Sequence, residues 1–178
     1  MRAPLEPAFL ALAPGDGNQR FTIFHPPGRE PLLGRVVQVH AFGEEMNKSR
    51  RMVAQQARAL ARAGFAVFQI DLFGCGDSAG DFGEATWQRW LDDVVWAARH
   101  LRQRMAQASV SVPPTPLWLW GHRAGALLAV EAAVRLGEEE PCHLLLWQPT
   151  LAGRSTVQQF LRLKMAAGLA RAGGGRLF

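Results

Sequence analysis

The sequence has few of the features that mark disulfide-rich, zinc-binding or membrane-spanning proteins. It contains two cysteines, Cys75 and Cys142, which lie far apart without CxxC or Cys/His spacing. This arrangement argues against a disulfide framework and a structural zinc site, and it favours reduced thiols. No segment approaches the ~18 uninterrupted apolar residues of a membrane span, and the proline-containing N-terminus is not a secretory signal. We therefore expect a cytoplasmic protein without a metal site.

The composition indicates one ordinary globular domain. The chain has 178 residues, of which 48% are hydrophobic and 20% are charged, and its net charge is +5. This length suffices to bury a substantial core. A basic surface could favour an anionic substrate, nucleic acid or a membrane face. The basic residues are spread along the chain and alternate with acids, so we interpret them as a solvated surface. No nucleic-acid-binding signature accompanies them.

Short β-like runs alternate with segments of helical periodicity. The first two runs, residues 8–13 and 20–27, flank a turn-rich loop and predict an antiparallel hairpin. Further strands are predicted at 35–43, 65–74, 117–121 and 142–149, with helices at 49–63, 85–105 and 124–136 between them. This alternation predicts an α/β fold with a mostly parallel sheet, right-handed crossovers and helices on both faces.

Two of the predicted helices carry a recognisable apolar face. In the first, the residues at helical spacing are Met52, Val53, Gln56, Ala59, Leu60 and Ala63. In the second, one broad face holds Trp87, Trp90, Leu91, Val94, Val95, Ala98 and Leu101, and the arginines and aspartates are expected on the opposite face.

The stretch from Gly121 to Gly125, GHRAG, lies between a predicted strand and a predicted helix. It has the frame of the nucleophile elbow of α/β-hydrolases, G-x-S-x-G, with Arg123 where the serine stands. The glycines fit a strained tip at which strand and helix approach closely. Arg123 cannot act as a nucleophile, because its guanidinium stays protonated. No histidine follows His143, so a serine, acid and histidine triad cannot be assembled in the usual chain order.

Two interpretations of Arg123 remain open. In the first, Arg123 contributes its charge to an anion site for a carboxylate or phosphate. The start of the following helix and nearby backbone N–H groups complete that site. In the second, Arg123 pairs internally with Glu44, Glu45 or Asp71 and fills the former catalytic pocket. The candidates for oxyanion or anion binding are Ala41, Phe42, Arg123 and Ala124, and the expected pocket residues are His40, Glu44, Glu45, Asp71 and His122.

Two further loops follow predicted parallel strands, at the edge where open α/β sheets build their sites. The loop HAFGEEMNKSR provides an oxyanion-hole N–H in hydrolases; alternatively it is a polar loop capped by Asn47 or Ser49. The loop DLFGCGDSAGDFG lacks the G-x-G-x-x-G spacing of dinucleotide-binding loops, so we expect no cofactor. Cys75 within it could replace the nucleophile, but no base is visible beside it and a structural thiol is favoured.

The combination of EEMNKSRRM, DLFGCGDSAGDF, LWGHRAGALLA and LLLWQPTLAGRSTVQQFLRLKMA resembles the exosortase-A-system-associated hydrolases of the second type. That family has an α/β-hydrolase fold and is encoded with exopolysaccharide and protein-sorting genes. The resemblance covers most of the chain, and in the family an arginine at the elbow tip is common. It implies residues 1–150 as the N-terminal part of an α/β-hydrolase core, incomplete at its C-terminal end, and 151–178 as the start of a helical cap.

Two functions follow as expectations. The resemblance implies an ester or acyl hydrolase of exopolysaccharide metabolism that lacks the elbow serine, and a pseudoenzyme is compatible with that lack. The alternative is a non-catalytic binding protein in which Arg123 and the elbow amides hold an anionic sugar or acyl group. The expected partner is therefore a small molecule or acidic sugar rather than nucleic acid. The oligomeric state is left open.

Overall fold

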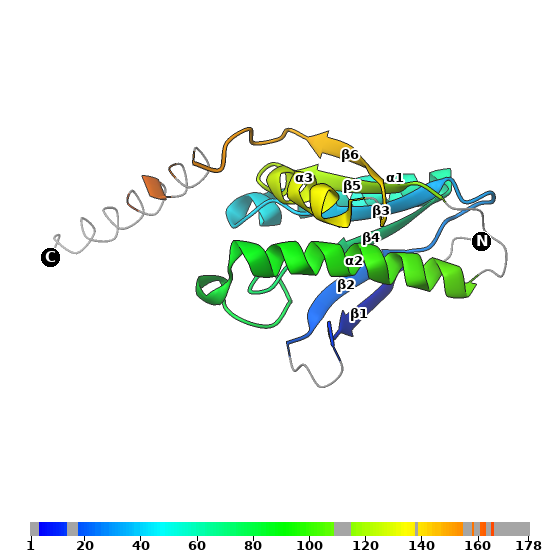
Figure 1. Cartoon of the computed structure of the whole chain (residues 1–178), viewed down its shortest axis with the longest axis horizontal. Helices are drawn as coiled ribbons and strands as arrows, with labels where there is room; N and C mark the ends of the chain where they lie inside the picture. Colours follow the sequence, from blue (N-terminus) through cyan, green and yellow to red (C-terminus); the bar gives the residue numbers. More distant parts are fainter. Residues whose placement is uncertain are drawn as a thin grey trace, which may run out of the picture.

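The computed structural model describes residues 4–13, 18–108, 115–137 and 139–154, together with residues 158, 161, 162 and 165. Strands and helices alternate along most of the chain (Figure 1). In chain order the elements are β1 Glu6–Leu10, β2 Arg20–His25, β3 Gly34–Val39, α1 Glu44–Ala63, β4 Phe65–Ile70, the short 3₁₀ helix η1 Phe82–Glu84, α2 Trp87–Ala108, β5 Leu117–His122, α3 Gly125–Leu136 and β6 Cys142–Trp147.

One six-stranded sheet contains all of these strands in the order β1-β2-β4-β3-β5-β6. The first two strands form the predicted antiparallel hairpin, and β2 pairs antiparallel with β4. The pairs β4-β3, β3-β5 and β5-β6 are parallel. The predicted mostly parallel sheet is therefore confirmed, and the carboxyl ends of β3, β4 and β5 meet at one edge.

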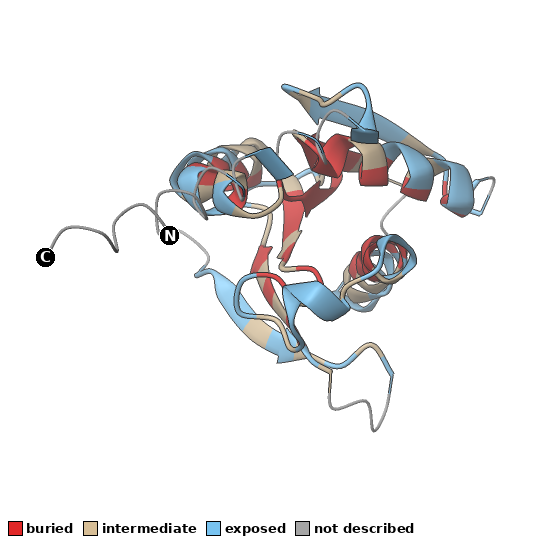
Figure 2. Cartoon of the chain, turned by 90° about the vertical axis from the view of Figure 1, so that its left-hand side faces the viewer, coloured by how far each residue is buried: buried red, intermediate tan, exposed pale blue. Residues whose placement is uncertain are grey.

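The helices cover both faces of the sheet, as predicted. Helix α1 packs on β4 and β2, whereas α2 and α3 pack against each other and on β3, β4 and β5 from the other side (Figure 1). Buried residues gather in the central strands and on the helix faces turned toward them (Figure 2). Strand β6 is an edge strand in the described residues, and Leu144, Leu145 and Leu146 each remain 39% exposed.

The first helix corrects two predictions. Helix α1 begins at Glu44 after Gly43, whose φ of 58° lies in the left-handed region, so neither Asn47 nor Ser49 caps it. The hydroxyl of Ser49 instead donates to the carbonyl of Glu45 within the helix. The predicted apolar face was only partly right: Val53 is buried and Leu60 packs against the same cluster, but the other buried residues are Met46, Ser49, Ala57 and Ala61. Alanines occur on several faces of this helix, so the sequence pattern does not single out one face. The face that is buried is the one that packs against Val36, Val67 and Trp120 of the sheet.

Helix α2 buries the predicted face from Trp90 to Leu101, while Trp87 at its start is 39% exposed. One residue was misplaced: Asp93 was expected among the exposed polar residues, and it is fully buried. Its carboxylate is compensated by Arg20 of β2, as described below. Strand β1 also begins two residues earlier than predicted, with Glu6 and Pro7 paired to β2. Proline is tolerated there because β1 is an edge strand.

Within the described part of the chain, no helix is both long enough and apolar enough to cross a membrane. The predicted cap segment, residues 151–178, lies mostly outside the described residues and stays a prediction.

Candidate active site at the carboxyl edge of the sheet

The GHRAG stretch forms a sharp turn between β5 and α3. A Cβ atom at Gly121 would lie 2.5 Å from the Cα of Ala126, and one at Gly125 would overlap the carbonyl oxygen of His40. Both positions therefore require glycine, because the strand, the helix and the end of β3 approach one another closely. Arg123 stands at the tip with a φ of 54°. This is the strand, strained residue and helix arrangement of a nucleophile elbow.

The backbone of Arg123 is fixed by three hydrogen bonds. Its N–H donates to the carbonyl of Trp147 at 3.1 Å, and its carbonyl accepts from the N–H groups of Ala126 and Thr150, each at 3.1 Å. A non-glycine residue in the left-handed region costs on the order of 1–3 kcal/mol. These bonds to α3, to the last residue of β6 and to the segment after it hold the turn against that cost.

The side chain of Arg123 pairs with Glu45 in the first turn of α1. Its Nε and Nη2 donate to Oε1 of Glu45 at 3.1 and 2.9 Å. The two side chains are 32% and 39% exposed, so the pair contributes about 0–1 kcal/mol to stability. The internal pairing considered for Arg123 is thus present, and its partner is Glu45. Glu44 instead pairs with Lys48, and Asp71 pairs with Arg50.

Two helices begin near this ion pair, and their N-termini stabilise negative charge. Helix α3 begins directly after the turn and α1 begins at Glu44, and the N-terminus of a helix carries about half a positive charge. Among the described residues, the backbone N–H groups of Phe42 and Ala124 have no hydrogen-bond acceptor. Ala41 and Ala124 are themselves buried. Glu45 therefore places a carboxylate where an anion is electrostatically stabilised.

His40 links two of the loops at this edge. The N–H of Leu72 donates to its Nε2 at 3.1 Å, so Nδ1 must carry the proton, and it donates to the carbonyl of Ala41 at 2.6 Å. Burial is the main cause that lowers the pKa of His40. With both ring nitrogens engaged in the neutral form, His40 is not free to act as a general base. It positions the loop that follows β3 against the loop that follows β4.

His122, the last residue of β5, faces Trp147 of β6, with ring centroids 5.2 Å apart. Burial is the largest cause that lowers its pKa, and the charge of Arg123 lowers it further, against the opposing effect of Glu45. Its Nδ1 is buried without a hydrogen-bond partner among the described residues. Thus His122 lies beside Arg123 in the chain, but no hydrogen bond joins it to a nucleophile in the described residues.

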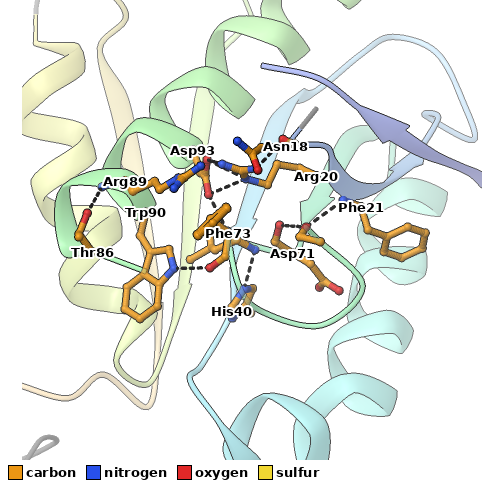
Figure 3. Close-up of polar contacts among 12 residues, drawn as sticks. Asn18, Arg20, Phe21, His40, Asp71, Phe73, Thr86, Arg89, Trp90 and Asp93 are labelled. Carbon is orange, nitrogen blue, oxygen red and sulfur yellow. Dashed lines mark hydrogen bonds and ion pairs between the residues drawn. The ribbon is translucent and has the colours of Figure 1, made fainter. Parts of the chain in front are cut away.

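A buried ionic network behind the site was missed by sequence reasoning (Figure 3). Arg20 donates from Nε to both carboxylate oxygens of Asp93 at 2.9 Å, and the Nη2–Oδ1 distance is 2.8 Å. The N–H of Phe73 donates to Asp93 Oδ2 at 2.7 Å, and the indole N–H of Trp90 donates to the carbonyl of Phe73 at 2.9 Å. The network fixes the loop after β4. The signal for it was the position of Asp93, three residues after Trp90 on the apolar face of α2.

The thiol of Cys75 lies buried in the same loop. Burial, followed by the charges of Asp71 and Asp93, raises its pKa to about 12. A thiol with such a pKa contains almost no thiolate at neutral pH, and thiolate is the nucleophilic form. The geometry therefore favours a structural role for Cys75.

The described residues contain no group of three or more His, Cys, Asp or Glu side chains arranged to hold a metal ion. Of the predicted site residues, Glu45 pairs with Arg123 at the elbow, and the backbone of His40 lies against Gly125 there. The side chains of His40 and Asp71 line a separate pocket beside α1.

Comparison with known families is decisive for the fold. A family model described as "Serine aminopeptidase, S33" matches residues 30–173, which is most of the chain. The chain belongs to this hydrolase family. The α/β-hydrolase fold predicted from the sequence is confirmed, and the finer resemblance to the exosortase-associated type stays a prediction. No curated protein matches the S33-family chain significantly.

Solved structures of other proteins share the fold. A soluble variant of monoglyceride lipase from Saccharomyces cerevisiae is 20% identical with a TM-score of 0.64, and the match covers 92% of this chain and 53% of that one. A highly thermostable carboxyl esterase from Bacillus coagulans is 23% identical with a TM-score of 0.57, with 81% and 44% covered. XC6422 from Xanthomonas campestris, an α/β serine hydrolase without a lid, is 23% identical with a TM-score of 0.53, with 81% and 71% covered.

These identities lie below 25% and show the fold alone. The chain spans about half the length of the lipase and the esterase.

Proposed function

We propose that this S33-family chain uses the elbow to bind an anionic group, a carboxylate or an acidic sugar, and does not carry out serine-type ester hydrolysis. The observation that carries the proposal is the guanidinium of Arg123, which stands at the elbow tip beside the start of α3 and holds the carboxylate of Glu45. Glu45 acts as an internal counter-ion that a ligand carboxylate replaces. The N–H groups of Phe42 and Ala124 are the further donors available to that ligand.

Thermal unfolding in the presence of D-glucuronate tests the proposal, with D-glucose as the neutral control. A ligand that binds only the folded state raises the unfolding temperature. We expect glucuronate to raise it, glucose to leave it unchanged, and Arg123→Ala to abolish the effect. Arg135→Ala is the matched control, because Arg135 also holds a half-exposed carboxylate, that of Asp92, away from the elbow. Equal stabilisation of Arg123→Ala and the unaltered protein would overturn the proposal.

Glu45→Gln provides a second readout of the same site. If the Glu45 carboxylate competes with the ligand, its removal strengthens binding of glucuronate. Because the pair is partly exposed, we expect a gain of about fivefold or less, corresponding to at most about 1 kcal/mol. Weaker binding in Glu45→Gln would show that Glu45 is not a competitor.

Ester or acyl hydrolysis is the second candidate, and membership of the S33 family favours it. It is tested with p-nitrophenyl acetate and butyrate. We expect no turnover above that of Arg123→Ala. Turnover that survives Arg123→Ala and disappears in Cys75→Ala would instead assign a thiol enzyme. The association with exopolysaccharide and exosortase genes belongs to the same proposal, and the genes flanking the coding sequence test it directly.

A further inference from the structure

A pocket of about 140 Å³ lies between α1 and the sheet, and neither Arg123 nor Glu45 lines it. Its floor consists of side chains from three neighbouring strands, β2, β4 and β3. Ile23 pairs with Gln69, and Gln69 pairs with Gln38, so these three residues form one row across the sheet. Two residues further along the strands, Phe21, Asp71 and His40 form the next row.

The floor contains one buried amide, that of Gln38, whose N–H groups lack an acceptor among the described residues. Gln38 is 2% exposed, and its Nε2 is buried without a hydrogen-bond partner among the described residues. The Oε1 of its neighbour Gln69 lies 2.6 Å from Nε2 of His25, so this oxygen is already engaged and does not accept from Gln38. A buried amide without a partner costs about 1–3 kcal/mol outside water. The floor therefore favours an occupant with a hydrogen-bond-accepting oxygen.

The charged groups of the pocket are already paired. Oδ2 of Asp71 accepts from Nη2 of Arg50 and from the N–H of Asp77, each at 3.0 Å. His40 is neutral, with both ring nitrogens engaged. No unpaired charge among the lining residues is left to compensate an ionic ligand, and an uncompensated ion is costly to remove from water. The occupant should therefore be neutral.

The remaining walls and the size restrict the occupant further. The side chains of Met46 and Val53 from α1 and of Phe21 and Ile23 from β2 give an apolar lining. A cavity of about 150 Å³ is known to hold a benzene molecule, so this pocket has room for about six non-hydrogen atoms.

We propose that this pocket is a binding site for a small neutral molecule that joins a short apolar chain to a hydrogen-bond-accepting oxygen, such as a four-carbon alcohol or ketone. The oxygen accepts from the amide of Gln38, and the apolar chain lies against Met46 and Val53. This site is separate from the elbow and does not depend on anion binding by Arg123.

The test uses four probes of equal chain length that differ in charge: 1-butanol, 2-butanone, butyrate and butylammonium. Each is titrated into the ¹⁵N-labelled full chain while the side-chain amide signals of Gln38 and Gln69 are followed by NMR. We expect saturable shifts with the two neutral probes and none with the two ions. Absence of saturable shifts with both neutral probes, or equal binding of butyrate, would overturn the proposal, and occupation by water alone corresponds to the first of these results.

Two variants locate the binding site. Ala54 lines the pocket, so Ala54→Leu fills it and should abolish binding, whereas Ala59→Leu is the matched control at another half-buried position of the same helix that does not line the pocket. Gln38→Leu removes the donor and should weaken binding of 2-butanone about tenfold, the value of one hydrogen bond of ordinary strength. Gln38→Leu also tests the assignment if Ala54→Leu does not fold. Arg123→Ala should bind the neutral probes normally. Unchanged binding in both pocket variants would refute the assignment.

Discussion

Replacement of Asp93 by asparagine should destabilise the protein strongly. The side chains of Arg20 and Asp93 are 1% and 0% exposed, and three donor groups converge on the carboxylate: Nε and Nη2 of Arg20 and the N–H of Phe73. Asparagine retains the size and can still accept from Phe73. It cannot neutralise Arg20, which would remain as a buried and uncompensated charge. Removal of one partner from such a pair typically costs 3–5 kcal/mol.

We therefore expect Asp93→Asn to lower the free energy of unfolding by about 3 kcal/mol, at the lower end of that range because one hydrogen bond is kept. In a domain of this size such a loss lowers the unfolding temperature by roughly 6–12 °C. Urea unfolding followed by circular dichroism and tryptophan fluorescence gives the free energy.

The adjacent residue provides the control. Asp92 lies in the same helix and pairs with Arg135 at 2.6 Å, but both side chains are about half exposed. Asp92→Asn should cost no more than about 1 kcal/mol. The reasoning would be refuted if Asp93→Asn were no more destabilising than Asp92→Asn. The double replacement Arg20→Met with Asp93→Leu should recover most of the loss, because well-packed apolar residues can replace a buried ion pair.

Three further predictions concern pH, thiol reactivity and association. The lowered pKa of His40 means that the unfolded chain takes up a proton before the folded one as the pH falls below about 6.5, so the free energy of unfolding should decrease from pH 7.5 to 5.5; equal values would contradict this. Cys75 should not react with Ellman's reagent in the folded protein and should react in 6 M urea. A fast thiol reaction in the folded native protein that is missing from folded Cys75→Ala would show that Cys75 is accessible. Because β6 is an exposed edge strand within the described part of the chain, Leu145→Lys should reduce light scattering of concentrated protein, and unchanged scattering would exclude this edge as the cause.

The order of strands and helices could be predicted because it depends on local pattern. Apolar runs bounded by glycine and proline gave each strand, and Gly121 and Gly125 gave the turn between β5 and α3. The start of α1 was missed because Gly43 uses a left-handed conformation in place of a side-chain cap. No polar capping residue is required by such a start, so the pattern of serine and asparagine was misleading.

The partners of the charged residues could not be predicted from the sequence. Glu44, Glu45 and Asp71 were equivalent candidates for Arg123. In the helix, Glu44 and Glu45 project about 100° apart, so only one of them can face the elbow. Asp93 was equally ambiguous, because burial of its carboxylate depends on Arg20, a residue 73 positions away in the chain.

The elbow shows why family membership and reaction are separate conclusions here. The turn depends on the backbone: on space that only glycine leaves at positions 121 and 125, and on three hydrogen bonds to the main chain of Arg123. None of these contacts involves the side chain at the tip, so the turn can form with arginine in place of serine. The serine reaction, by contrast, requires a nucleophilic side chain at the tip. A guanidinium has no lone pair for attack on a carbonyl carbon, but it offers a fork of donors that matches a carboxylate. The geometry that positions a nucleophile in other hydrolases therefore positions a fixed positive charge in this one, and Glu45 shows that a carboxylate can bind there.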